Sequence, residues 1–133
     1  MEEARFVVYR LGHLLIDEEH QKILKQMEKA VIAEKIADTV ALRETLEYIH
    51  LSTVTHFIHE EEIMDRSMYP YREWHKSVHA MILKELKKLN DNFIALDNRI
   101  YAERFFADSL EKLISRHIDE SDKQMVDWLK KRN

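Results

Sequence analysis

The chain has 133 residues and a formal net charge of −4, with one glycine, one proline and no cysteine. This length suits a single domain that buries about two-thirds of the surface of its unfolded chain. Scattered lysines and arginines argue against nucleic acid as a partner, the missing cysteine excludes disulfides and thiolate metal sites, and no apolar run is long enough to cross a membrane.

Scarce glycine and proline, with abundant Leu, Ile, Lys and Glu, favour long helices with short connections. We expect an all-α fold: an antiparallel up-down-up-down four-helix bundle with an N-terminal arm and a short C-terminal helix. The whole chain, 1–133, is expected to be one complete domain. Its arm is predicted at 1–15 and its helices at about 17–36, 40–66, 71–90, 100–119 and 122–131. The acidic start does not suit a secretory signal, which favours a cytoplasmic location.

Apolar residues in 1–15 surround Gly12 without helical spacing, which predicts an extended arm. Asp17 is the candidate cap of the first helix. His20 lies one turn before the apolar face of that helix. This face is formed by Ile23, Leu24, Met27, Ala30 and Val31.

The second and third helices show the alternating spacing of four and three that is typical of a bundle core. Thr39 is the candidate cap of the second helix, and the third begins just after Pro70. The core positions of the second helix are Leu42, Leu46, Ile49, Thr53, His56, Glu60 and Ile63. Those of the third are His75, His79, Ile82, Leu86, Leu89 and Phe93.

The fourth helix places Phe106, Leu110, Leu113 and His117 on its core face. Ser121 and Gln124 have the form of a capping box, which predicts the start of the short last helix. Every one of the first four helices therefore carries histidine at a core position.

Five of the eight histidines lie at these core positions: His20, His56, His75, His79 and His117. His13, His50 and His59 lie off the core faces and are expected at the surface, as are Glu61 and Glu62. One core histidine alone is most simply a hydrogen-bonded neutral side chain, but five facing each other need partners that a cation supplies together. Imidazole and carboxylate ligands suit iron, zinc, copper or manganese. Their number favours two ions bridged by carboxylates.

Four motifs follow one another along nearly the whole chain. They are Ile16-Asp17-Glu18-Glu19-His20, His56-Phe57-Ile58-His59-Glu60-Glu61, Tyr69-Pro70 followed by His75 and His79, and His117-Ile118 through Asp122. Together they resemble the motifs of the hemerythrin family in its bacterial single-domain form, the bacteriohemerythrins.

The resemblance implies two Fe ions in an oxo- or hydroxo-bridged di-iron centre. The implied ligands are His20, His56, His75, His79 and His117, with Glu60 and Asp122 bridging the ions. The three histidines of the third and fourth helices would saturate one iron. The other two would leave a position open, where the family binds dioxygen reversibly as a peroxide. This implies oxygen storage, delivery or sensing rather than an enzyme.

Spacing alone and the resemblance disagree about the second bridging carboxylate. Glu120 lies about 60° from His117 on an ideal helix, whereas Asp122 lies about 140° away. Spacing therefore favours Glu120, and the resemblance selects Asp122. Asp122 requires the helix to end, kink or bulge between Ile118 and Ser121.

An apolar oxygen pocket is expected beside the open iron, lined by Ile23, Phe57, Ile82, Leu113 and Ile114. The chain departs from the family here, because customary aromatic residues are replaced by Ile82 and Leu113, and Tyr9 stands in place of an N-terminal tryptophan. None of these residues is an implied ligand. The departures bear on the lifetime of the oxygen adduct rather than on metal binding.

Two further readings remain open. A di-iron oxidase, peroxidase or iron-handling enzyme can use the same bundle, but such proteins draw on Glu-x-x-His spacing that the predicted core faces lack. A helical module with a structural metal, or a sensor module, is the third reading. The sequence leaves open whether dioxygen, nitric oxide or iron itself is the physiological ligand, and what the oligomeric state is.

Overall fold

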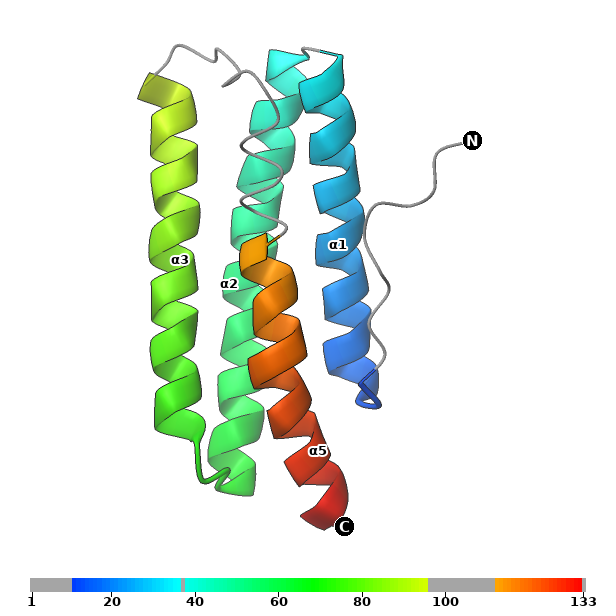
Figure 1. The fold of residues 1–133 in the computed structure, drawn as a ribbon, viewed down its shortest axis with the longest axis vertical. Coiled ribbons are helices and arrows are strands. Elements are labelled where there is room, and N and C mark those ends of the chain that lie inside the picture. The colour runs from blue at the N-terminus through cyan, green and yellow to red at the C-terminus, as the bar shows by residue number, and fades with distance from the viewer. Residues whose placement is uncertain (1–10, 37, 96–111, 133) are drawn as a thin grey trace.

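The computed structural model describes residues 11–36, 38–95 and 112–132. Its elements are α1 (Leu14–Lys35), α2 (Thr39–Ser67), α3 (Arg72–Ala95), a π-helical turn η1 (Ile118–Asp122) and α5 (Lys123–Arg132). Residues 112–117 are α-helical and lead into η1. Figure 1 shows α1, α2, α3 and the helix formed by 112–132 side by side, each antiparallel to the next. The predicted all-α four-helix bundle is confirmed.

The N-terminus of α1 differs from the predicted one, because the helix begins at Leu14 rather than near Asp17. His13 is its cap, and the ring Nδ1 accepts a hydrogen bond from the Ile16 N–H at 3.4 Å. The Asp17 carboxylate instead accepts the backbone N–H groups of residues 11 and 12, at 2.9 and 3.0 Å. The last two residues of the predicted arm are therefore helical, and residues 1–10 lie outside the described residues.

The connections around α2 are short. Asp38, rather than the predicted Thr39, caps the helix, because its Oδ1 accepts the Ala41 N–H at 3.0 Å. After Ser67 the chain turns at Met68, which adopts a left-handed conformation with φ of 58°. Pro70 follows, and α3 begins two residues later. This tight turn fixes how α3 lies against α2.

The C-terminal helix α5 follows the stretch 112–117 without a non-helical break. Within η1 the Lys123 N–H donates to the Ile118 carbonyl, five residues earlier, which is the hydrogen bond of a π-helix. A bulge, not an end or a kink, therefore joins the last two helices. The capping-box start predicted at Ser121 is wrong, because that residue lies inside the continuous helical path.

Two groups of buried apolar side chains fill the bundle. The larger group consists of Ile23, Leu24, Met27, Ala30, Val31, Ala33, Leu42, Leu46, Ile49, Phe57, Ile82, Leu86, Ile114 and Ile118. The smaller group, at the end with the α2–α3 turn, consists of Ile16, Met64, Tyr69, Met125 and Val126. The predicted core faces supply most of these residues, except that Met64 replaces the partly buried Ile63. Leu89, Phe93, Phe106 and Leu110 have no described side chains.

A layer of polar residues separates the two groups. On α2, Glu60 lies between Phe57 of the larger group and Met64 of the smaller. On α1, His20 lies in the same way between Ile16 and Ile23. Helices α1 and α2 thus present these polar side chains between the same two apolar groups.

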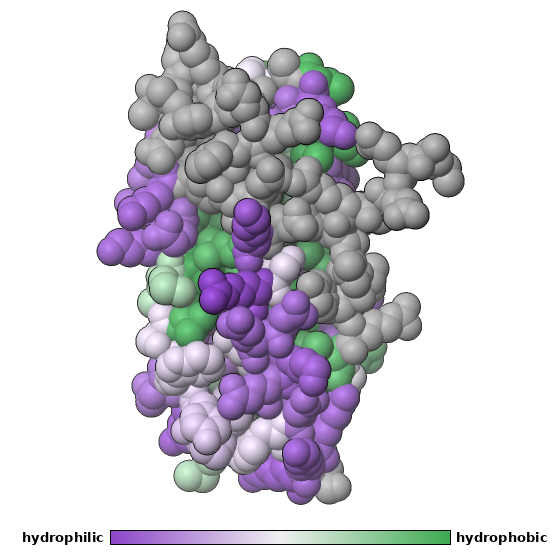
Figure 2. Space-filling view, in the orientation of Figure 1, coloured by the Kyte–Doolittle hydropathy of each residue, from purple (hydrophilic) through white to green (hydrophobic). Residues whose placement is uncertain are grey.

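The surface in Figure 2 is mainly hydrophilic over α5 and hydrophobic between α3 and the stretch 112–122. None of the helices in the described part of the chain is both long and apolar enough to span a lipid bilayer.

Candidate metal centre

Seven polar side chains occupy the layer between the two apolar groups, and each is at most 5% exposed. They are His20, His56, Glu60, His75, His79, His117 and Asp122. They come from α1, α2, α3 and the helical stretch 112–122. The structure therefore brings together all seven side chains that the sequence predicts as ligands.

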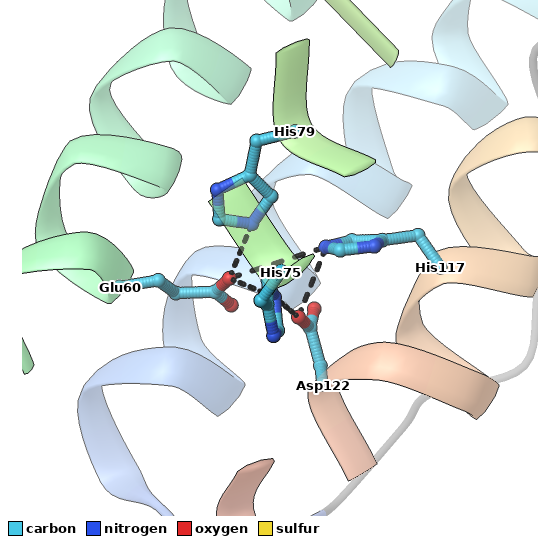
Figure 3. A group of neighbouring side chains, drawn as sticks. All are labelled: Glu60, His75, His79, His117 and Asp122. Atoms are coloured by element: carbon cyan, nitrogen blue, oxygen red, sulfur yellow. Dashed lines mark hydrogen bonds and ion pairs between the residues drawn. The ribbon is translucent and has the colours of Figure 1, made fainter. Parts of the chain in front are cut away.

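Three imidazoles surround one oxygen of each carboxylate. The His79 Nε2 lies 3.0 Å from the Glu60 Oε1, and the His117 Nε2 lies 3.0 Å from the Asp122 Oδ1. The His75 Nε2 is close to both, at 2.9 Å from Asp122 Oδ1 and 3.3 Å from Glu60 Oε1. Figure 3 shows the three rings pointing toward these two oxygens. One ligand atom from each of the five residues lies within 4.8 Å of every other.

Two imidazoles face the other oxygens of the same carboxylates. The His56 Nε2 lies 2.8 Å from the Glu60 Oε2. The His20 Nε2 lies 2.8 Å from the Asp122 Oδ2 and 3.6 Å from the Glu60 Oε2. Each carboxylate thus directs one oxygen to the three-histidine set and one to the two-histidine set, which is the arrangement that lets a carboxylate bridge two ions.

Asp122 rather than Glu120 reaches this layer. Asp122 is fully buried, whereas the Glu120 side chain is 65% exposed and pairs with Arg116 at 3.4 Å. The cause is η1, because a π-helical turn contains more residues than an α-helical turn and so returns Asp122 to the face that carries His117. Periodicity of an ideal α-helix could not place it there.

Most ligand atoms of the layer are arranged to coordinate metal ions rather than to hydrogen-bond with one another. The Nε2 atoms of His56, His75 and His117 are buried without hydrogen-bond geometry to any partner in the described residues, as are Glu60 Oε2 and Asp122 Oδ1. Yet these nitrogens lie within about 3 Å of carboxylate oxygens. Lone pairs that converge without hydrogen-bond alignment suit a cation between them. The N and O donors suit iron.

The carboxylates and imidazoles of the layer shift one another's pKa values. Burial would lower the pKa of His56, but the charge of Glu60 and the hydrogen bond to Glu19 raise that pKa to about 10. Burial opposes charge on His75 too, and the carboxylates of Asp122 and Glu60 raise its pKa to about 9. Burial would raise the pKa of Glu60, and the facing imidazoles hold it well below its usual range. In the metal-free protein, protons on His56 and His75 supply positive charge that cations would otherwise supply.

A small cavity of about 10 Å³ lies on the side of His20 and His56, with room for about one water-sized molecule. The predicted pocket residues Ile23, Phe57 and Ile114 line it. Thr53 and Ile118 line it too, although neither was predicted as a pocket residue. Thr53 could have been found from the sequence, because it lies on the predicted core face of the second helix.

The structure places the other two predicted pocket residues elsewhere. Ile82 and Leu113 line an outer groove between α3 and the stretch 112–121, together with the exposed Trp74 and Met81. His117 borders both this groove and the small cavity.

The histidines predicted at the surface are partly exposed, and two have partners. His13 caps α1, and the His59 Nδ1 lies 2.6 Å from the Glu19 Oε2. The predicted solvated position of Glu61 is wrong, because this half-buried carboxylate contacts the His79 Nδ1 at 2.9 Å. Glu62 is exposed, as expected.

A helical bundle in which two sets of buried imidazoles share two carboxylates defines a class of proteins, the carboxylate-bridged metal-binding bundles. The family model described as "Hemerythrin HHE cation binding domain" matches residues 12–129. The chain belongs to the hemerythrin family, which binds non-heme iron. The family resemblance of the sequence motifs is thereby confirmed.

The relatives are bacterial. Bacteriohemerythrin of Stenotrophomonas maltophilia is 27% identical over 124 residues, which are 90% of this chain and 76% of the relative. Bacteriohemerythrin of Pseudomonas aeruginosa is 26% identical over 120 residues, 87% of this chain and 74% of the relative. No solved structure matches the chain.

Proposed function

We propose that the protein binds two iron ions in the polar layer and binds dioxygen reversibly at the ion held by His20 and His56. The observation that carries the proposal is the division of the oxygens of Glu60 and Asp122 between the two sets of imidazoles. This division offers one ion three nitrogens and two oxygens, and the other ion two nitrogens and two oxygens. An octahedral ion at the second position therefore keeps room for a ligand.

The side chains around the second position favour binding over turnover. Bound iron supplies a redox-active centre with an open position. Ile23, Phe57 and Ile114 give the adjacent cavity an apolar lining. The Thr53 hydroxyl donates to the Ile49 carbonyl at 2.7 Å, so its proton is used within α2. Among the described cavity-lining residues, every titratable group is a proposed ligand, which leaves none free to act as a general acid or base.

Oxygen storage, delivery or sensing are the roles that such binding serves. The cytoplasmic location and the lack of a nucleic-acid partner stay predictions from composition and charge.

The proposal is tested by loading the protein with ferrous iron without air and recording its optical spectrum through cycles of air and vacuum. We expect two irons per chain and a band that appears in air and bleaches under vacuum over repeated cycles. His56→Ala should abolish the band, and His50→Ala, a partly exposed histidine outside the layer, should retain it. One zinc per chain without a chromophore contradicts the proposal. Sustained consumption of hydrogen peroxide with a reductant identifies an enzyme instead.

A further inference from the structure

Two carboxylates outside the proposed ligand set contact the outer edges of ligand rings. The Glu19 Oε1 lies 2.9 Å from the His56 Nδ1, and the Glu61 Oε2 lies 2.9 Å from the His79 Nδ1. The outer nitrogens of the other three rings behave differently. In the part of the chain that the structure describes, no hydrogen-bond partner faces the Nδ1 atoms of His20, His75 and His117. In each set of imidazoles, one ring is thus hydrogen-bonded to a carboxylate through its outer nitrogen.

The contact with Glu19 fixes the protonation of His56. A carboxylate only accepts hydrogen bonds, so the His56 Nδ1 carries the proton and donates it to Glu19. The Nε2 lone pair of a neutral ring then points to the interior, where a metal ion takes it. The same hydrogen bond also fixes the rotation of the ring.

Glu19 is itself held in place from both sides. Its second oxygen accepts a hydrogen bond from the His59 Nδ1 at 2.6 Å. His56 and His59 are three residues apart on α2, so both rings face α1 and both donate hydrogen bonds to the same carboxylate. The Glu19 side chain is only 16% exposed, whereas that of His59 is 38% exposed. The contact links α1 and α2 beside His20 and His56, the two ligands that these helices supply.

We propose that Glu19 is a positioning residue for the two-histidine site, anchored by His59, and that Glu61 serves the three-histidine site in the same way. The inference rests on the proposed function, because it assumes that both sets bind metal. Its consequence is selective: loss of Glu19 weakens the ion at His20 and His56, and loss of Glu61 weakens the ion at His79. Removing such an outer partner typically costs 10- to 100-fold in metal affinity.

The test uses Zn²⁺ alone, titrated against a competing chelator into the full chain. Glu19→Ala should leave one ion at the wild-type affinity and bind the second about 10- to 100-fold more weakly. Glu18→Gln, an exposed neighbour, should change neither affinity. Histidine nitrogen NMR identifies the site, because at one equivalent of Zn²⁺ the Glu19→Ala protein should show bound His79 and free His56. Glu61→Ala should show the reverse.

A conservative variant separates the hydrogen bond from simple packing. Glu19→Gln keeps an oxygen that accepts the His56 proton and should recover part of the affinity lost in Glu19→Ala. In the wild-type protein loaded with Zn²⁺, the His56 proton should be on Nδ1. The Glu19→Gln variant decides the question even where Glu19→Ala does not fold.

The outcomes distinguish the inference from the proposed function. If Glu19→Ala binds two Zn²⁺ ions with the affinities of the wild-type protein, the inference is overturned and the proposed function stays intact. An equal loss of affinity at both sites has the same meaning. A His56 proton on Nε2 overturns the inference as well. A wild-type chain that binds fewer than two ions overturns both.

Discussion

Asp122 connects the last helix to both sets of imidazoles. Its two oxygens lie 2.8 to 3.0 Å from the Nε2 atoms of His20, His75 and His117, which come from three different elements. The carboxylate is fully buried, and burial with the neighbouring Glu60 charge would raise its pKa. The facing His117 and His20 rings hold that pKa below its usual range instead. Asp122 therefore offers both oxygens ionised at neutral pH.

Substitution at Asp122 should remove two-ion binding, because both sets of imidazoles lose a shared oxygen. We expect Asp122→Asn to bind at most one ion tightly, with a loss of about 100-fold or more for the other. Glu120→Gln is the matched control, since this exposed carboxylate pairs with Arg116 and does not reach the layer. Metal analysis after dialysis measures both. Two tightly bound ions in Asp122→Asn would show that the carboxylate is not a bridge.

Metal binding should release protons, because the rings of His56 and His75 are charged in the metal-free chain. The pKa of His56 is raised from 6.5 to about 10 and that of His75 from 6.5 to about 9, so both rings carry an extra proton at pH 7.5. A metal ion must displace these protons. We expect about two protons released per chain, measured by calorimetry of Zn²⁺ binding in buffers of different ionisation enthalpy. Binding without proton release contradicts the raised pKa values.

The same shifts set the sign of the pH dependence of stability. The folded metal-free chain binds more protons than the unfolded chain between about pH 6.5 and 10. The stabilising contribution of the two rings is therefore fully present below pH 6.5. It is lost as pH rises through 9 and 10. Urea titrations of metal-free protein at pH 6 and pH 9 should show the lower free energy of unfolding at pH 9.

Spacing predicts the five inward histidines and Glu60, because a residue on a helix face stays there in any regular bundle. Asp122 followed only from the family motif, since no ideal helix places it near His117. Glu19 and Glu61 were not predicted as partners. Their contacts depend on which helix lies opposite, and a single helix carries no signal for that.

At the level of elements, η1 decides which residues of the last helix face the core. It places Asp122 on the helix face that carries His117. It also sets the register of α5, whose Met125 and Val126 belong to the smaller apolar group. A π-helical turn contains one residue more than the α-helical turn it replaces. The extra residue is accommodated at the exposed side, where Glu120 lies.

Deletions on either side of Asp122 test this register. Deleting Glu120 should convert η1 into an α-helical turn that keeps Asp122 on the His117 face, so two ions should still bind. Deleting Lys123 rotates α5 by about 100° and withdraws Met125 from the core. That should cost about 2 to 5 kcal/mol of unfolding free energy, measured by denaturant titration of the metal-free chain. Equal effects of the two deletions contradict the role given to η1.

Helix boundaries were predicted less well than helix faces. Asp17 and Thr39 both have residue types that cap helices, but Asp17 accepts the backbone N–H groups of residues 11 and 12, and Asp38 caps α2 in place of Thr39. Several capping residues stand side by side in these segments. Local sequence alone does not choose between them, because the choice depends on how the chain enters the helix.

At the level of the whole molecule, the bundle holds a charged layer between two apolar groups. Buried charges cost free energy unless they are paired. Ions bound by the folded chain alone offset this cost and add stability by mass action. The centre therefore belongs to the stability of the fold as well as to its chemistry.

Removal of metal should lower the melting temperature without abolishing the helices. Free Zn²⁺ at 100 times the dissociation constant of a site stabilises the folded chain by about 2.7 kcal/mol. Thermal unfolding followed by circular dichroism, with Zn²⁺ and with excess chelator, measures this difference. The His56→Ala variant is the control and should respond less to Zn²⁺. An identical melting temperature in both conditions for the wild-type chain shows that the layer does not bind the ion.

The central claim is that two ions lie in one polar layer and share Glu60 and Asp122. Anomalous diffraction at the iron edge, on crystals of the iron-loaded protein, tests it most directly. We predict two peaks, one among His75, His79 and His117 and the other beside His20 and His56, with both carboxylates between them. A single peak, or two peaks of which one lies outside this layer, would contradict the account.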